Sequence, residues 1–504
     1  MKSYKLLLAF TLFLAFAFNM KAQYVHERSD QYTPPEDSLV IQKLHHWQDQ
    51  KFGMLIHWGL YSVAGIVESW SICSEEADWI PRDSTMAYED YKKWYWGLKD
   101  SFNPTRFDPE QWAQAAKSAG MRYAIFTTKH HDGFNMFNTA FSDFSIAKGP
   151  FQTDPRADVA KYVFEAFRNN DLMVGAYFSK PDWHSEYYWW PRYATPRRTQ
   201  NYNIDKNPWR WNQFKEFTYN QIGELMHNYG PIDILWLDGG WVNNPGTKSV
   251  LDMDRISQMA RQAQPGILFV DRTIHGKYEN YQTPEQQIPD KQLPYPWETC
   301  MTLGVDWGYT PHAVFKSPVT VIAKLMEIVA KGGSLLLGVG PTPEGILQDE
   351  IVSRLQTIGG WMKKNGTAIY NTVTTPQYYS EGIWFTMNKD GKTMYALYSN
   401  PETEKFPDYI EWENNIPAKR SAIYCLQNGK KVKWEIKNNR VRVYLPQNLK
   451  TEVNAPRISL FTQTSYSIKR KGQTSDNKPT DRTQKRRSIF HTSPLLLSFF
   501  KDGL

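Results

Sequence analysis

Asp238 is the side chain of this sequence best placed for nucleophilic or base chemistry. It directly follows the apolar run Ile234–Leu237 and precedes Gly239 and Gly240. A short apolar run of this kind is typical of a strand buried on both faces. Such a strand would deliver the carboxylate to its end, where the small glycines would leave room for a ligand. The spacing alone fits equally well an aspartate that caps the following helix.

Two glutamates are candidates for a second carboxyl group. Glu285 lies in a proline-flanked stretch and Glu298 follows Trp297, while Arg272, which ends the run Ile267–Arg272, offers a fixed fork of donors. Two carboxyl groups, one a nucleophile or base and the other an acid, are what the hydrolysis of a glycosidic bond requires. Either glutamate could supply the proton, and a surface position is the plainer reading of Glu285, since proline-flanked loops usually face water.

Three histidines stand at the ends of predicted strands. His57 ends the first apolar run, and His130 and His131 follow the second. Three histidines can form a zinc site, but no cysteine or carboxylate flanks them at the usual ligand spacing. Imidazole donors and acceptors bind sugar hydroxyls as readily. We therefore expect a polar pocket and no metal, while a metal-dependent hydrolase stays open as an alternative.

The elements that must position these residues alternate between apolar runs and helical patterns. Six runs, each apolar first and polar last, lie at 52–59, 123–134, 172–179, 234–240, 267–272 and 334–341. Helices are expected at 212–229, 250–264, 319–331 and 348–365, and another opens at Asp108-Pro109 and closes at Gly120. This alternation predicts an α/β fold, a (β/α)8-like barrel over residues 23–372 that carries its chemistry at the carboxyl ends of the strands.

The rest of the chain has a different texture. Short β-rich runs separated by turn residues predict a small antiparallel β-sandwich over 373–463, followed by a tail at 464–504 whose composition predicts disorder. At the other end, residues 1–22 place Lys2 and Lys5 before an apolar run, the order of a signal peptide. The run is too short for a membrane anchor, so we expect export to the periplasm or the medium.

Composition argues against nucleic acid as a partner. The formal net charge is +7, but residues 465–504 carry nine Lys or Arg against three Asp, and three lysines lie in the leader. The remaining body is slightly acidic, whereas a phosphate-binding groove needs basic charge on the folded surface. Aromatic residues make up 15% of the chain, with 20 Trp. Such rings can cover the apolar faces of sugars, although most aromatic residues fill the core.

Taken in order, the motifs of the chain resemble the α-L-fucosidases of glycoside hydrolase family 29. The similarity spans about residues 24–372, and the later sandwich is similar to that family's carboxyl-terminal domain. The motifs that carry it are HWGLYS at 57–62, TKHHDGF at 128–134, AYFSKPDW at 176–183, LWLDGG at 235–240, VDR at 270–272, YQTPEQ at 281–286 and WETC at 297–300.

The resemblance implies a retaining exo-glycosidase that acts on fucosylated glycans without a cofactor. Asp238 would be the nucleophile and Glu285 the acid/base, with Glu298 as the runner-up for that role. The residues expected to bind the sugar are His57, Glu68, Trp70, His130, His131, Tyr177, Arg272 and Glu298.

Two departures from the family's pattern stand out. The stretch 68–73 reads ESWSIC where many members have Glu and Trp adjacent, which weakens the choice of Glu68 and Trp70, and Gly338 replaces a commoner Asn. An α-L-galactosidase and an inactive carbohydrate-binding protein remain as alternatives. The sequence indicates neither the linkage, the leaving group nor the oligomeric state.

Overall fold

The computed structural model describes residues 31–464, except for 74, 76–79, 81, 83–84, 400–406, 419–420 and 447–457. The predicted signal peptide at 1–22 and the predicted tail beyond residue 464 lie outside the described residues. Both therefore stay predictions, as does the division of the chain into two domains at residue 372.

Seven parallel strands form the sheet that carries the candidate site. Their spatial order is β5-β4-β3-β2-β1-β7-β6, and every neighbouring pair is parallel. The strands are β1 (Phe52–Ile56), β2 (Tyr123–Lys129), β3 (Met173–Ser179), β4 (Ile234–Asp238), β5 (Leu268–Asp271), β6 (Glu298–Thr302) and β7 (Ser334–Val339). Every residue of these strands is buried, as continuous apolar runs predict for strands covered on both faces. The predicted barrel-like α/β fold is confirmed.

An irregular segment fills the gap between β5 and β6, where an eighth strand would close the barrel. Instead of a regular ladder, this segment forms isolated bridges, Gln282 to Trp297 just before β6 and Glu285 to Cys300 of β6. Pro284 has no N–H to donate and Gln286 has a positive φ of 55°, so a regular ladder cannot form there. The segment thus reaches the carboxyl-end rim as a loop.

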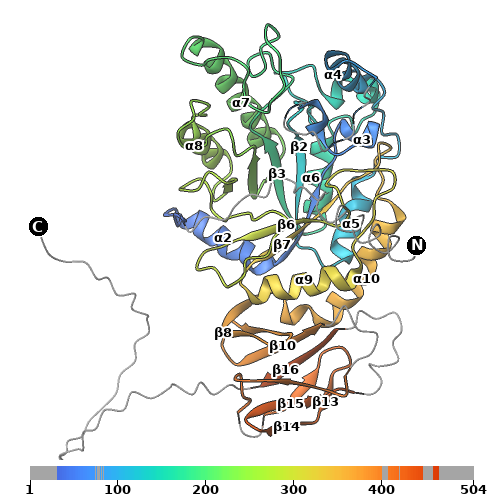
Figure 1. Ribbon diagram of the computed structural model, residues 1–504, viewed down its shortest axis with the longest axis vertical. Helices are drawn as coiled ribbons and strands as arrows, with labels where there is room; N and C mark the ends of the chain where they lie inside the picture. Colours follow the sequence, from blue (N-terminus) through green and yellow to red (C-terminus); the bar gives the residue numbers. More distant parts are fainter. Residues whose placement is uncertain are drawn as a thin grey trace, which may run out of the picture. The chain divides into compact units, whose positions relative to one another are not determined.

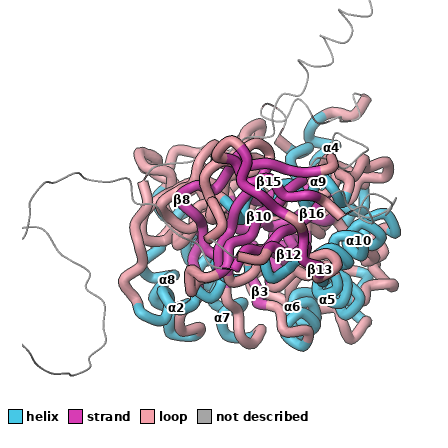
Figure 2. Tube along the Cα trace, turned by 90° about the horizontal axis from the view of Figure 1, so that it is seen from below, coloured by secondary structure: helices cyan, strands magenta, loops and turns pink. Residues whose placement is uncertain are grey.

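Helices surround this sheet. They are α2 (Ser38–Gln50), α3 (Tyr61–Ala64), α4 (Tyr88–Gly97), α5 (Pro109–Ser118), α6 (Val159–Asn169), α7 (Pro208–Asn228), α8 (Met253–Ala263), α9 (Pro318–Ala330) and α10 (Asp349–Asn365), with short 3₁₀ turns at Ser69–Ile72, Leu98–Asp100, Ile146–Lys148, Pro150–Thr153 and Gly366–Ala368. Figure 2 shows α8, α2, α7, α6, α5 and α10 around the periphery. Trp47 of α2 stacks on Tyr281 with ring centroids 3.9 Å apart, which covers one end of the sheet's inner core.

The predicted helix signals are mostly confirmed. The Asp108 side chain accepts hydrogen bonds from the backbone N–H groups of Glu110 and Gln111, and Gly120 follows the helix with a φ of 86°. Helix α7 begins at Pro208, four residues before the predicted start, because proline suits the first helical turn. Helix α8 begins three residues after the predicted start, where Asp252 caps it by accepting from Arg255 N–H.

Two antiparallel sheets follow the last helix. One has the order β13-β12-β16-β10-β9-β8 and the other β11-β15-β14. Their strands are β8 (Thr372–Ser380), β9 (Ile383–Asn388), β10 (Thr393–Ser399), β11 (Tyr409–Trp412), β12 (Ile423–Cys425), β13 (Lys430–Val432), β14 (Trp434–Lys437), β15 (Arg440–Tyr444) and β16 (Ile458–Thr464). Phe385, Ile423, Trp412 and Val443 belong to one shared core, so the predicted sandwich is confirmed. In Figure 1, α9 lies between the parallel sheet and β8 to β10, in contact with β8 and β9.

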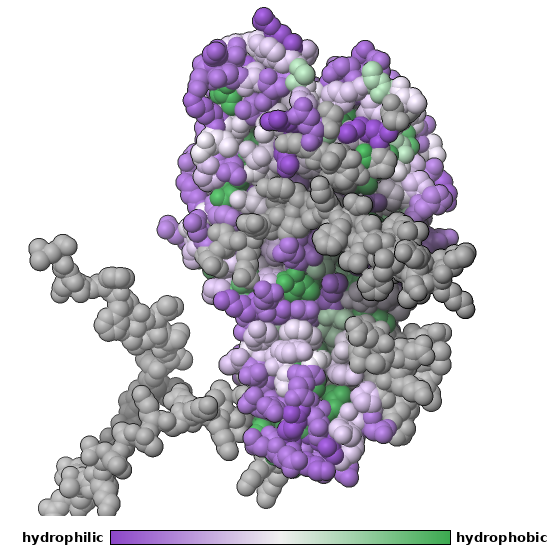
Figure 3. Space-filling model, in the orientation of Figure 1, coloured by the Kyte–Doolittle hydropathy of each residue, from purple (hydrophilic) through white to green (hydrophobic). Residues whose placement is uncertain are grey.

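The face drawn in Figure 3 is mostly hydrophilic where it is described. Figure 3 shows hydrophobic residues as small separate patches among hydrophilic ones over the described part of that face. Within the described ranges, no helix is both long enough and apolar enough to cross a membrane. Cys73, Cys300 and Cys425 are buried, and none of them forms a disulfide.

Candidate active site

Asp238 ends strand β4 at the rim of the sheet. Its side chain is almost buried, with 9% of the residue exposed. Tyr177, on the neighbouring strand β3, donates its hydroxyl to Asp238 Oδ2 at 2.6 Å, and Lys180 N–H donates to the Asp238 carbonyl at 3.0 Å. A buried strand therefore delivers this carboxylate, as predicted, and the Asp238 side chain caps no helix in the hydrogen bonds described.

The two glycines after Asp238 allow neighbouring loops to approach the end of β4 closely. A Cβ added at Gly239, whose φ is 88°, would lie 2.3 Å from Cδ of Pro181, and one at Gly240 would lie 1.9 Å from Oγ1 of Thr273. Protein atoms occupy the space beside both glycines, and room for a sugar there stays a prediction. The glycines allow the loops after β3 and β5 to pack closely against the end of β4.

Arg272 joins Asp238 to Glu285. Its Nη1 donates to Asp238 Oδ1 at 2.7 Å and its Nη2 donates to Glu285 Oε2 at 2.9 Å. Its Nε donates to Thr283 Oγ1 at 3.1 Å, and the guanidinium lies 4.2 Å from the ring centroid of Trp236. Burial opposes the charge, but Asp238, Cys300 and Glu285 raise the pKa of Arg272 above its usual value. One permanently charged fork therefore holds both carboxyl groups.

Glu285 is nearly buried beside Arg272. It is 8% exposed and receives a second hydrogen bond, from Trp307 Nε1 to its Oε1 at 3.2 Å. The plainer sequence reading of a surface glutamate in a proline-flanked loop is therefore wrong. The loop lies over the rim because it replaces the eighth strand.

The three histidines lie side by side near Asp238. Ring centroids of His57 and His130 are 5.3 Å apart, those of His130 and His131 are 4.2 Å apart, and His131 Nε2 lies 3.8 Å from Asp238 Oδ2. Burial lowers the pKa of His130 to about 4, and burial together with His130 lowers the pKa values of His57 and His131 well below the usual range. All three imidazoles are therefore neutral near pH 7.

Two serines contact the Nδ1 atoms of His130 and His131 and so orient these rings. Ser179 donates its hydroxyl to the Pro181 carbonyl at 2.7 Å, so it can only accept from His131 Nδ1, which lies at 2.7 Å. This leaves His131 Nε2 as an acceptor that faces the Asp238 side of the pocket. Ser69 Oγ lies 2.6 Å from His130 Nδ1. Such second partners orient imidazoles for contact with a ligand.

Glu68 and Trp70 also lie at the site, although the sequence around them departs from the family's pattern. Glu68 is 2% exposed and its Oε1 accepts from the backbone N–H groups of Trp307 and Gly308 at 3.0 and 3.2 Å. Burial, reinforced by Asp306, raises the pKa of Glu68 to about 8. The Trp70 ring stands edge-on to His131, with centroids 5.2 Å apart.

Aromatic rings continue outward from His131. Trp241 lies 5.0 Å and Trp183 5.2 Å from the His131 ring, and the Arg198 guanidinium lies 5.3 Å from the centroids of both Trp70 and Trp241. Trp189 stacks on Trp183 at 5.2 Å. Arg198 and Trp189 both belong to the segment between β3 and α7.

Glu298 is the one predicted site residue that the structure does not bring to the rim. It is the first residue of β6, pairs with Ser334 at the start of β7, and is fully buried. Its oxygens accept from Tyr123 hydroxyl at 2.7 Å and Trp236 Nε1 at 3.3 Å. Tyr123 is the first residue of β2. Glu298 therefore lies in the inner core beneath Trp236, at the amino ends of the strands, and we propose no contact with a substrate.

Replacing Glu298 with glutamine is expected to change the pH dependence of stability. Burial raises the pKa of Glu298 to about 7 from 4.5, so the folded protein retains a proton that the unfolded chain releases. Stability from this group is complete below pH 4.5 and is lost as the pH rises to about 7. Glu298→Gln should remove this pH-dependent decrease in the free energy of unfolding, which amounts to at most about 3 kcal/mol. Unfolding in urea at pH 5 and pH 8 measures it, and an unchanged difference between the two pH values contradicts it.

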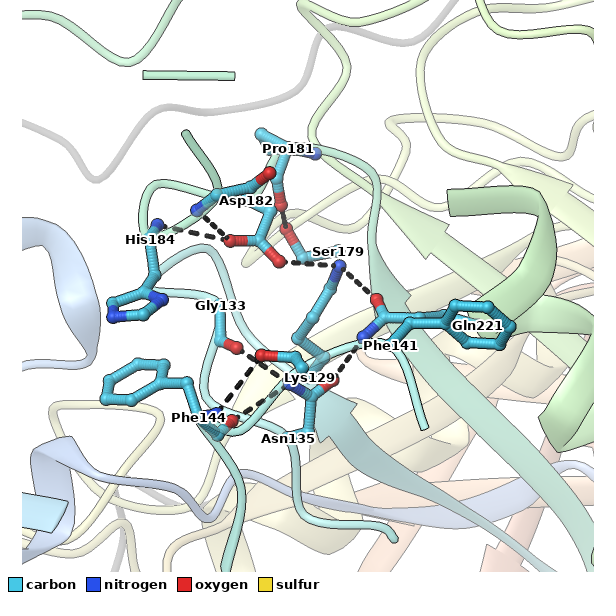
Figure 4. Close-up of polar contacts among 12 residues, drawn as sticks. Lys129, Gly133, Asn135, Phe141, Phe144, Ser179, Pro181, Asp182, His184 and Gln221 are labelled. Carbon is cyan, nitrogen blue, oxygen red and sulfur yellow. Dashed lines mark hydrogen bonds and ion pairs between the residues drawn. The ribbon is translucent and has the colours of Figure 1, made fainter. Parts of the chain in front are cut away.

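A buried ion pair supports the loop that carries the histidines. Figure 4 shows Lys129, at the end of β2, directed towards Asp182 and Gln221. Its Nζ lies 3.1 Å from Asp182 Oδ2 and 3.0 Å from Gln221 Oε1, and both charged side chains are almost inaccessible. A Cβ at Gly133 would lie 2.1 Å from Asp182 Oδ1, so the glycine of the KHHDGF motif is needed for this close approach.

Trp307 is a residue of the site that the sequence did not indicate. It lies in the loop after β6. Its side chain contacts Glu285, and its backbone N–H contacts Glu68. Ser69, Thr283 and Cys300 were missed as well; Cys300 Sγ lies 3.6 Å from Arg272 Nη2. The only available signal was Gly338, because a Cβ there would lie 2.7 Å from Cε3 of Trp307.

His130, His131 and Asp238 also form a possible metal-ligand group, with one candidate atom from each within 4.8 Å of the others. The donor set fits a cation poorly. The Nδ1 atoms of both histidines face serine hydroxyls, and both oxygens of Asp238 already accept hydrogen bonds, one of them from a guanidinium. A positive charge beside Arg272 would be repelled. The group is better suited to hold hydroxyl groups beside a carboxylate.

Comparisons with known proteins point to one family. The model of the α-L-fucosidase family matches residues 19–367. Human plasma α-L-fucosidase is 27% identical over 448 residues, covering 82% of this chain and 89% of that protein. The structure of α-L-fucosidase isoenzyme 1 from Paenibacillus thiaminolyticus superposes with a TM-score of 0.70 at 28% identity, over 86% of this chain and all of that one.

One further solved structure is a family 29 α-L-fucosidase from Bacteroides thetaiotaomicron, trapped as a covalent intermediate with 2-fluoro-fucosyl fluoride. It is 22% identical, with a TM-score of 0.66, and covers 87% of this chain and all of that one. At this identity the likeness shows a shared fold.

Proposed function

The chain belongs to the α-L-fucosidase family, and we propose that Asp238 is the nucleophile and Glu285 the acid/base with which it hydrolyses terminal α-L-fucosyl linkages of glycans. The single observation that carries this assignment is the Arg272 fork, whose two nitrogens bind one carboxyl group each. Retaining glycosidases need their carboxyl groups about 5–5.5 Å apart. Hydrogen bonds to one guanidinium bring the two carboxyl groups close together, as that mechanism requires.

The charges of the site suit the first step. Arg272 and Tyr177 both donate to Asp238, which stabilises its ionised form, as a nucleophile requires. Arg272 always carries one positive charge. If one of the two carboxyl groups is protonated and the other ionised, the net charge of Arg272, Asp238 and Glu285 is zero, which a desolvated site favours. We assign that proton to Glu285.

The reaction then proceeds in two balanced steps. An oxygen of Asp238 bonds to the anomeric carbon while the bond to the leaving-group oxygen breaks and Glu285 gives that oxygen its proton. In the second step a water molecule gives a proton to Glu285, its oxygen bonds to the anomeric carbon, and the ester to Asp238 breaks. Two inversions leave the configuration of fucose unchanged.

The neutral imidazoles would bind the sugar hydroxyl groups. His131 Nε2 is an acceptor beside Asp238, and among the described residues His57 Nδ1 is buried without a hydrogen-bond partner. A buried polar atom of this kind costs free energy unless a ligand satisfies it. His57 and His131 therefore offer groups that a bound hydroxyl can pair with.

The test is the configuration of the first product. Proton NMR of the reaction with an aryl α-L-fucoside should show α-L-fucose first, with β-L-fucose appearing only through mutarotation. Initial release of β-L-fucose, or no release at all, would overturn the proposed roles. An aryl α-L-galactoside in parallel tests the sugar, because a hydroxymethyl in place of the methyl is expected to cost about ten-fold or more in kcat/KM.

Export by way of residues 1–22 is part of the proposal and rests on the order of Lys2, Lys5 and the apolar run that follows. N-terminal sequencing of the protein recovered from the producing cells tests it. A mature chain that begins near residue 23 in the exported fraction is expected. Retention of residues 1–22 inside the cell would contradict export.

A further inference from the structure

Trp307 and Arg272 each donate a hydrogen bond to Glu285. The Trp307 indole N–H donates to Oε1 at 3.2 Å, while Arg272 donates to Oε2 at 2.9 Å. The two donors come from different elements, the loop after β6 and the end of β5, so together they fix the plane of the carboxyl group. Neither donor can accept a proton, because an indole N–H and a guanidinium only donate.

The two donors differ in charge, and that difference distinguishes the two oxygens of Glu285. A hydrogen bond from an ionised donor is about twice as strong as a neutral one. Oε2 is therefore the oxygen that keeps the negative character, and the acidic proton belongs on Oε1, beside Trp307. The indole accepts no hydrogen bond from that proton, which leaves the proton free for the leaving-group oxygen.

The backbone of Trp307 is fixed by a second buried carboxyl group. Glu68 Oε1 accepts from the N–H groups of both Trp307 and Gly308, and Glu68 itself has a positive φ of 34°. These bonds tie the loop after β6 to the loop after β1. The indole consequently approaches Glu285 from an anchored position.

Gly338 makes the space that the indole occupies. A Cβ at this position of β7 would lie 2.7 Å from Cε3 and 2.8 Å from Cζ3 of Trp307, closer than a methyl group can pack. The ring also lies 5.5 Å from that of His57. Gly338, which stands where asparagine is commoner in the family, therefore leaves room for the ring of Trp307 that contacts Glu285.

We infer that Trp307 is a positioning residue for the acid step, which fixes Oε1 of Glu285 as the oxygen that protonates the leaving group and stabilises the carboxylate left behind. The inference rests on the proposed role of Glu285. It adds a residue to that role, since nothing in the chemistry of two carboxyl groups requires an indole there.

The variant that tests it is Trp307→Phe, which keeps most of the ring and removes the N–H. The substrates are 2-chloro-4-nitrophenyl α-L-fucoside, whose leaving group needs little protonation, and phenyl α-L-fucoside, whose leaving group needs a proton. We expect kcat/KM to fall about ten-fold for the phenyl substrate, since a hydrogen bond to a charged group is lost. For the activated substrate we expect a change of less than about two-fold.

The pH profile gives a second readout that lost packing would not move. The alkaline limb of kcat/KM for phenyl α-L-fucoside should shift to higher pH, because the ionised form of Glu285 loses a donor. The described titratable groups near Glu285 include Arg272, Cys300, Glu68 and, across Arg272, Asp238, and the substitution leaves all four in place.

Trp112→Phe is the matched control. Its indole also donates one hydrogen bond, to the Gly345 carbonyl at 3.1 Å, but from α5 on the outside of the sheet. It should reduce stability and affect both substrates equally. An equal loss on both substrates, or no loss, in Trp307→Phe would overturn the inference while leaving the role of Glu285 intact. If Glu285→Gln also fails to discriminate between the substrates, the proposed function fails too.

Discussion

Replacing Asp238 with alanine is expected to lower kcat/KM for aryl α-L-fucosides by about 10⁴-fold or more, as the loss of a nucleophile does in other hydrolases. No other described carboxylate accepts hydrogen bonds from both Tyr177 and Arg272, so none can take its place at the anomeric carbon. Added azide should fill the space left by the carboxylate and displace the leaving group in one step. The product would be β-L-fucosyl azide, with inverted configuration.

The loss must be separated from a loss of folding, because Asp238→Ala leaves the buried Arg272 with one carboxylate fewer. Asp238→Asn keeps the volume of the side chain and should be equally inactive, with a melting temperature closer to that of the unchanged protein. Asp171→Ala removes an exposed aspartate paired with Lys117 and should retain full activity. An Asp238→Asn enzyme with more than about one-tenth of normal activity would contradict the assignment.

Replacing Glu285 with alanine should have the second largest effect, and one that depends on the leaving group. For phenyl α-L-fucoside the loss should be about 10²- to 10⁴-fold, the usual contribution of acid–base catalysis. For the 2-chloro-4-nitrophenyl substrate the first step needs little acid, so the second step becomes limiting. Azide should then attack the covalent intermediate in place of water and yield α-L-fucosyl azide, with retained configuration.

The matched control for this experiment is Glu298→Gln. Both glutamates are buried, but Glu298 bonds to Tyr123 and Trp236 in the inner core while Glu285 bonds to Arg272 at the rim. Glu298→Gln should keep the normal ratio of rates for the two substrates. If it discriminates between them and Glu285→Ala does not, the acid is Glu298, and the proton would have to come from the opposite end of the strands.

The parallel sheet could be predicted from the sequence because each strand is a short apolar run that ends in polar residues. That rule placed Asp238, His57, His130 and His131 at one rim, and the structure brings all four together. Strand β6 was not predicted, because its sequence ETCMT contains a glutamate and two threonines and is not a continuous apolar run. Glu298 was expected at the site as a second carboxyl group and from the resemblance, but it begins its strand and does not end it.

Residues whose position depends on packing could not be predicted. The burial of Glu285 depends on an irregular segment in the place of an eighth strand, and the proline beside it suggested solvent. Trp307 reaches Glu285 only because Gly338, on another strand, leaves space for its ring. The role of a glycine after a catalytic residue is likewise not readable from the sequence. Gly239 and Gly240 allow the close approach of Pro181 and Thr273, which come from other loops.

The central claim is that Asp238 forms a covalent bond to fucose, and labelling with 2-deoxy-2-fluoro-α-L-fucosyl fluoride tests it most directly. The fluorine at C2 slows both steps, while the good leaving group lets the first step proceed, so the intermediate accumulates. Mass spectrometry of the digested protein should show one fluorofucosyl group per chain, on the peptide that contains Asp238. A label on any other residue, or an active enzyme that turns the compound over without accumulating a label and releases β-configured product, would contradict the account.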